Sequence, residues 1–158
     1  MQQQQADGAT AKGGLTVVIK SADGAQRIVE LGENTLCQAY LNAVAAWSTG
    51  ANNTGYNPTS PPMQFILGTG TGTPEVSDTV LFAPQSGTQM GLAARTANAN
   101  TCIFTVNYNT GQLSGTFTEA GLLDANSNLM THLVFQTPLS VTNTEAATFI
   151  WSVTWNAG

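Results

Sequence analysis

His132 is the only histidine in the sequence and its most chemically versatile side chain. An imidazole can act as a general base, complete a nucleophilic triad or bind a metal ion. A triad needs an activated nucleophile, and the sequence has no Gly-x-Ser-x-Gly elbow. A metal site needs further ligands, which two distant cysteines, Cys37 and Cys102, supply poorly. We therefore expect a partly buried or interfacial histidine, and no catalytic residue, metal site or cofactor.

Two pairs of carboxylates lie close in sequence: Glu75 with Asp78, and Glu119 with Asp124. Such pairs serve acid–base catalysis or calcium binding when they belong to an acidic cluster, and neither pair does. The segment Asp124-Ala125-Asn126-Ser127-Asn128 spaces its oxygens like the first three ligands of a calcium loop. The glycine and the closing glutamate of such a loop are missing. We interpret the segment as a turn whose side chains bond their own backbone.

The run Gly68-Thr69-Gly70-Thr71-Gly72 resembles the start of a dinucleotide-binding fingerprint. That fingerprint needs another glycine where Thr73 stands, followed by a helix, whereas Pro74 comes next. The run is therefore predicted to be a loop between strands. Its threonines, Thr69, Thr71 and Thr73, are candidate contacts to a partner protein, chosen by their position in the chain.

Several β-rich runs predict the strands that must position these residues. They are Gly14–Lys20, Gln26–Leu31, Met63–Leu67, Val80–Phe82, Thr101–Tyr108, Leu113–Thr118, Leu129–Gln136 and Ala147–Trp155. One helix is predicted at about 35–47, with Asn34 as its N-cap. The asparagine- and proline-rich stretch 51–62 is predicted to be an irregular loop. The pattern indicates a mainly β protein, an antiparallel β-sandwich that is jelly-roll-like, with one α-helix in the N-terminal half.

A chain of 158 residues predicts one domain, which we place at 14–158. Residues 1–13 are predicted to form an extended polar arm that becomes ordered on a neighbouring subunit. Its glutamines, Gln2, Gln3, Gln4 and Gln5, are further candidate contacts to a partner. The N-terminus has no secretory pattern, and the apolar stretches are too short to span a bilayer, so we expect no membrane association.

Charged residues make up 8% of the chain, and nine acids against four bases give a net charge of −5. An ordinary globular domain has roughly 25% charged residues. Four bases cannot neutralise a useful run of phosphates, so we exclude nucleic acid and anionic membranes as partners. The surface must be largely neutral and polar. Such a surface suits a protein that is packed against fixed neighbours.

The segment Phe65–Leu81, with its apolar strand, Gly-Thr-Gly-Thr loop and Ser-Asp-Thr step, resembles a pattern found in virion proteins of tailed bacteriophages. Three later segments continue the resemblance: a Thr-Glu-Ala-Gly-Leu turn within Gly115–Asp124, a strand at Leu129–Phe135 and a closing strand at Thr148–Trp155. The resemblance covers residues 63–156. This sequence departs from the family pattern between Leu81 and Thr101. The pattern has an arginine-containing strand there, and the only arginine in this segment is Arg95.

The resemblance implies a non-enzymatic virion protein, most specifically a capsid decoration or cement protein that binds and stabilises the outside of the shell. Its implied partners are the major capsid protein and copies of itself, as a dimer or trimer. Its implied location is the capsid surface of the virion, after synthesis in the host cytoplasm. One alternative is a tail, baseplate or fibre-attachment component. A second is a carbohydrate-binding module, which would need exposed rings among Trp47, Tyr56, Trp151 and Trp155.

We interpret Cys37 and Cys102 as buried small hydrophobes, and leave a disulfide between them open.

Overall fold

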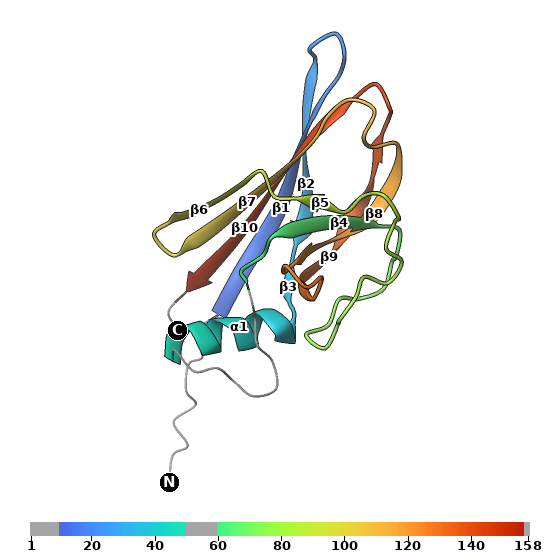
Figure 1. The fold of residues 1–158 in the computed structure, drawn as a ribbon. Coiled ribbons are helices and arrows are strands. Elements are labelled where there is room, and N and C mark those ends of the chain that lie inside the picture. Colours follow the sequence, from blue (N-terminus) through green and yellow to red (C-terminus); the bar gives the residue numbers. More distant parts are fainter. Residues whose placement is uncertain (1–9, 50–59, 157–158) are drawn as a thin grey trace.

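Two antiparallel β-sheets pack face to face in the computed structural model, which describes residues 10–49 and 60–156 (Figure 1). The first sheet has the order β2-β1-β10-β7-β6, with β1 at Thr10–Lys20, β2 at Gln26–Glu33, β6 at Ala94–Asn98, β7 at Thr101–Tyr108 and β10 at Ala146–Asn156. The second has the order β3-β9-β8-β4-β5, with β3 at Thr35–Leu36, β4 at Gln64–Gly68, β5 at Met90–Gly91, β8 at Gly115–Leu123 and β9 at Leu129–Val141. The predicted antiparallel β-sandwich is confirmed.

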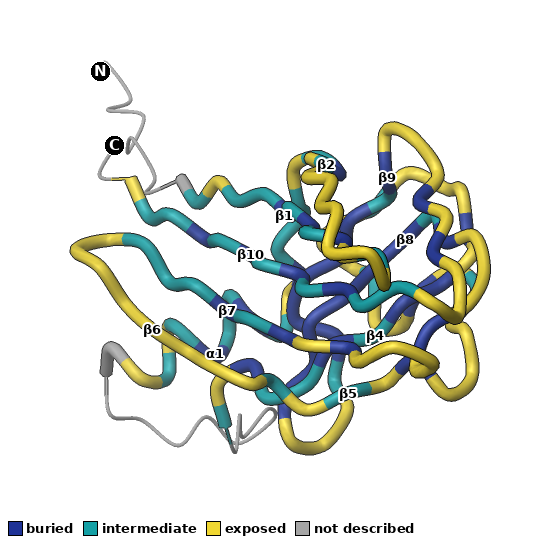
Figure 2. The backbone as a smooth tube through the Cα atoms, turned by 90° about the horizontal axis from the view of Figure 1, so that it is seen from above, coloured by how far each residue is buried: buried dark blue, intermediate teal, exposed yellow. Residues whose placement is uncertain are grey.

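Alternation along the strands builds the core between the sheets. Leu15, Val17 and Ile19 of β1 are at most 1% exposed, because every second side chain of a strand points to the same face. Across the interface, the Phe65 ring of β4 lies 4.9 Å from the ring of Phe149 in β10. Figure 2 shows buried backbone concentrated where the two sheets overlap. The core is therefore aromatic at its centre and aliphatic along β1.

The helix begins later than the sequence pattern indicates. It is α1, Gln38–Thr49, so the predicted start near residue 35 and the N-cap at Asn34 are wrong. Thr35 and Leu36 form β3 instead, which pairs with β9. The carbonyl of Cys37 accepts the N–H of Tyr40, which marks the first helical turn. Pairing with a strand from the second half of the chain thus overrides the local capping signal.

The remaining differences lie at strand ends and in short strands. β8 continues to Leu123 and β9 continues to Val141, beyond the predicted ends. The predicted strand at Val80–Phe82 is wrong, since an isolated bridge between Gly68 and Pro84 is the pairing found there. β5 and β6 were not predicted. Every residue of β6 is exposed, so that strand carries no apolar alternation by which to recognise it.

The N-terminal boundary of the folded domain lies earlier in the chain than predicted. Residues 10–13, assigned to the polar arm by sequence, belong to β1, where Thr10 lies opposite Asn156. The rest of the predicted arm, including Gln2–Gln5, lies outside the described residues, as does most of the predicted loop 51–62. Within the described ranges, no helix combines the length and the apolar character needed to cross a membrane.

Candidate functional site

The segment 69–83, which we term the clamped loop, leaves β4 and returns to it. Two backbone hydrogen bonds close its base: Thr69 N–H to the Ala83 carbonyl at 2.9 Å, and Gln85 N–H to the Leu67 carbonyl at 2.9 Å. A loop whose ends meet in this way is a compact unit that side-chain contacts can fix as a whole. The loop covers the face of the second sheet that points away from the main core, where Gly121 of β8 lies opposite His132 of β9.

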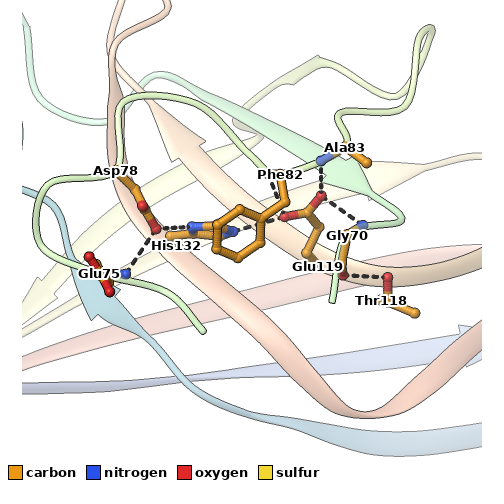
Figure 3. Close-up of polar contacts among 8 residues, drawn as sticks. All are labelled: Gly70, Glu75, Asp78, Phe82, Ala83, Thr118, Glu119 and His132. Atoms are coloured by element: carbon orange, nitrogen blue, oxygen red, sulfur yellow. Dashed lines mark hydrogen bonds and ion pairs between the residues drawn. The ribbon is translucent and has the colours of Figure 1, made fainter. Parts of the chain in front are cut away.

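The carboxylate of Glu119, from β8, holds both ends of the clamped loop (Figure 3). Its Oε1 accepts the N–H of Gly70 at 2.9 Å and of Ala83 at 2.7 Å. Its Oε2 accepts the N–H of Phe82 at 3.0 Å. The side chain is 0% exposed. Both oxygens of this buried carboxyl group therefore accept backbone N–H bonds, which satisfies donors of the loop that burial removes from water.

His132, from β9, connects Glu119 to the middle of the loop. Its Nε2 lies 2.8 Å from Glu119 Oε2, and its Nδ1 lies 2.7 Å from Asp78 Oδ2. That aspartate oxygen also accepts the N–H of Glu75 at 2.9 Å. Both ring nitrogens of His132 therefore lie within hydrogen-bond distance of a carboxylate oxygen. We name the Asp78–His132–Glu119 arrangement the clamp.

The clamp differs from the sequence-based expectation for His132. That side chain is 0% exposed, so the expectation of a partly buried or interfacial histidine underestimated its burial. The Phe82 ring covers it, with ring centroids 4.6 Å apart. The hydrogen bonds of both carboxylates named above go to the imidazole and to backbone N–H groups, so the clamp ties the loop to β8 and β9.

The glycines of the motif make room for the clamp. A Cβ atom on Gly68 would lie 2.7 Å from the Ala83 carbonyl oxygen, and one on Gly70 would lie 2.6 Å from Glu119 Oε1. A Cβ on Gly72 would lie 2.7 Å from the Phe82 ring. The alternation of glycine and threonine therefore has a structural reason: Gly68 and Gly70 are buried and Gly72 lies against the Phe82 ring, whereas Thr69, Thr71 and Thr73 are exposed.

A small second core forms beneath the loop. Leu81 is 3% exposed and packs with Cys37, Leu123 and Leu129. Burial, followed by the charge of Asp78, raises the pKa of the Cys37 thiol to about 12. Cys37 is buried as predicted, Cys102 is half-buried, and both are free thiols.

The clamped loop exposes apolar side chains as well as polar ones. The described residues include five exposed large hydrophobic side chains: Ile28, Trp47, Val76, Val80 and Phe82. Three of them, Val76, Val80 and Phe82, lie on the clamped loop and are 44–66% exposed. Together with Thr69, Thr71 and Thr73 they form what we term the loop surface. Exposed apolar and hydroxyl side chains of this kind are suited to contact with another protein.

The turn predicted at Asp124–Asn128 is confirmed. Asp124 is buried, and its Oδ1 accepts the N–H groups of Asn126 at 2.8 Å and of Asn128 at 2.9 Å. Its Oδ2 accepts the Asn128 side-chain amide at 2.8 Å. Both carboxylate oxygens thus bond within the turn. Across residues 10–49 and 60–156, no three His, Cys, Asp or Glu side chains are grouped to hold a metal ion.

The aromatic rings considered for sugar binding are scattered. Trp47 is 46% exposed, whereas Trp151 is 1% exposed in the core. Trp155 is half-buried and packs edge-to-face on Tyr40, and Tyr56 lies outside the described residues. The described rings therefore form no continuous stacking platform.

Sequence reasoning missed the clamp itself. Its members are separated by 13 and 54 residues, so no local motif joins them. One signal was available: Glu119 is followed by Ala120-Gly121-Leu122-Leu123 and His132 by Leu133-Val134-Phe135, and an ionisable side chain beside such apolar runs needs a polar partner if it is buried. Comparison of the chain with protein-family models, with curated proteins and with solved structures finds no match.

Proposed function

We propose that this protein is a non-enzymatic structural component of a tailed-bacteriophage virion, most specifically a capsid decoration or cement protein that binds the major capsid protein. The observation that carries the proposal is the loop surface, an exposed apolar and threonine-rich patch on a loop that the buried clamp holds fixed. The sequence resemblance over residues 63–156 supplies the virion context.

Preorganisation supports a binding role. A loop that is already fixed loses little conformational entropy when a partner docks, so more of the contact energy remains as affinity. Full burial of a valine or phenylalanine side chain contributes roughly 1.5–3 kcal/mol. The hydroxyls of Thr69, Thr71 and Thr73 can hydrogen-bond without the desolvation of a charge. The loop surface thus combines the features of a protein interface.

The first test is the copy number of the chain relative to the major shell protein, measured by quantitative mass spectrometry on purified particles. A ratio near one, or a simple fraction such as one-third, supports a decoration protein on the shell. A ratio of a few per cent assigns the protein to a tail, baseplate or fibre-attachment site. Its absence from the particle overturns the proposal and returns attention to Trp47 and a carbohydrate-binding role.

The second test asks whether the loop surface makes the contact. Val80→Asp places a charge on a side chain that is 66% exposed on the loop, and incorporation into particles is expected to fall at least tenfold. Ile28→Asp is the matched control, because Ile28 is 70% exposed on β2, outside the loop. Equal incorporation of both variants would show that another surface binds the partner.

A further inference from the structure

The edge strands of the two sheets differ in how well their unpaired backbone N–H and C=O groups are protected from pairing with another chain. A free edge strand is a template for pairing with another chain, and proteins commonly protect it by shortness, bulges or charges. The edges β3 and β5 have two residues each. The edge β2 carries Arg27, Glu30 and Glu33, and a register shift interrupts its pairing with β1 next to Gly32.

The remaining edge, β6, has none of these protections. It has five residues, all of them exposed, and its register with β7 runs without a shift from Ala94↔Thr105 to Asn98↔Thr101. Figure 2 shows it as a fully exposed strand along the rim of its sheet. Its one charged side chain, Arg95, turns back onto its own chain, where Nη1 lies 2.7 Å from Met63 Sδ. Among the described strands, none pairs with the outer backbone edge of β6.

The sequence of β6, Ala-Arg-Thr-Ala-Asn, is compatible with pairing to itself. An antiparallel pair centred on Thr96 sets Thr96 opposite Thr96 of the partner subunit, and Ala94 opposite Asn98 of the partner subunit. Arg95 then lies opposite Ala97 of the partner subunit, so the two arginines do not oppose each other directly. No like charges meet across such a pair.

We propose that β6 pairs with β6 of a second copy of this chain, joining the two five-stranded sheets into one continuous sheet across a twofold axis. A pair of identical edges closes on itself, so this contact makes a dimer and cannot make a trimer. The inference concerns the free protein and does not depend on the proposed function in the virion.

The direct test is analytical ultracentrifugation across micromolar to millimolar concentrations. The wild-type protein is expected to shift from its 16.4 kDa monomer mass to twice that mass. Thr96→Lys would set two lysines opposite each other and is expected to raise the dissociation constant at least tenfold. Thr110→Lys is the matched control, because it adds the same charge at an exposed turn outside β6 and should dimerise as the wild type does.

A charge-swap rescue fixes the register. Thr96→Glu alone should also remain monomeric, whereas an equimolar mixture of Thr96→Lys and Thr96→Glu should form a heterodimer. Circular dichroism of each variant confirms that the fold is retained. The proposal is overturned by a wild-type monomer at all concentrations, by a trimer, by a Thr96→Lys dimer as tight as the wild type, or by failure of the mixture to associate.

Discussion

At the scale of single residues, Glu119 is an acid whose burial is compensated within the protein. It accepts three backbone N–H groups and lies 2.8 Å from the imidazole Nε2 of His132, and all four contacts are lost or distorted if the carboxylate changes. Breaking one member of a buried ionic network leaves the others unpaired in a medium of low polarity. Removal of one member of the clamp is therefore expected to destabilise the protein far more than removal of one partner of a surface ion pair.

Glu119→Gln is expected to lower the free energy of unfolding by about 3–5 kcal/mol, since the amide nitrogen would face N–H donors. Hydrogen exchange should rise across residues 69–83 before it rises elsewhere. Glu75→Gln is the control, because Glu75 is exposed on the same loop and enters the clamp through its backbone N–H alone. Similar losses in the two variants, measured by urea unfolding, would contradict the role of the clamp.

Unfolding at alkaline pH tests how the buried thiol and phenol groups contribute to stability. Burial raises the pKa of Cys37 from 9.0 to about 12, and burial also raises the pKa values of Tyr40 and Tyr108 above 10.0. The unfolded chain releases these protons first, so the stability they confer is complete below about pH 9 and falls as the pH rises further. The expected slope in urea unfolding is up to about 1.4 kcal/mol per pH unit for each group. Cys37→Ala should flatten the decline between pH 9 and 10.

At the scale of elements, the sequence predicted those parts of the fold that local pattern determines. β7 was predicted at its observed bounds, β10 was located because its apolar residues share one face, and β1 was located because it is a β-rich run. The helix start failed because β3 pairs with β9, a contact that local capping signals do not contain. The sequence did not predict β6, because a fully exposed strand has no apolar face by which to recognise it.

The candidate site was predictable only in part. The loop position of Thr69, Thr71 and Thr73 followed from the glycines and Pro74, and the structure places these threonines at the surface. The reason for the glycines did not follow, because it depends on Glu119, which lies 49 residues beyond Gly70. Contacts over such separations arise from tertiary packing.

The glycine alternation gives a prediction for the loop as an element. Gly70→Ala would place a methyl group 2.6 Å from Glu119 Oε1 and against the Phe82 Cβ, so the loop must shift. We expect a loss of about 1–3 kcal/mol in unfolding free energy, together with faster hydrogen exchange in the loop. Gly91→Ala, on β5, meets nothing within 4 Å and should change stability by less than about 0.5 kcal/mol. Equal effects would contradict the inward orientation.

At the scale of the whole molecule, β1 is paired along both of its edges, with β2 on one side and with β10 on the other. Its apolar side chains Leu15, Val17 and Ile19 belong to the core that both sheets share. Damage to β1 is therefore expected to weaken the entire domain rather than one sheet.

A matched pair of isoleucines tests this expectation. Ile19→Ala, at 0% exposure on β1, is expected to lower stability by about 2–5 kcal/mol. Ile28→Ala, at 70% exposure on the neighbouring β2, is expected to change it by less than about 0.5 kcal/mol. Tryptophan fluorescence and far-ultraviolet circular dichroism should report the same midpoint in each variant. Separate midpoints for the two probes would indicate that the sheets unfold independently.

The pairing of β1 with β10 also has a consequence for how the chain leaves the ribosome. β1 emerges early and β10 last of the described strands, and translation at about 5–20 residues per second separates them by on the order of ten seconds. Throughout that time Leu15, Val17 and Ile19 lack their final cover. Nascent chains arrested before residue 146 should accordingly remain protease-sensitive and bind chaperones, and release of β10 from the exit tunnel should end both properties together.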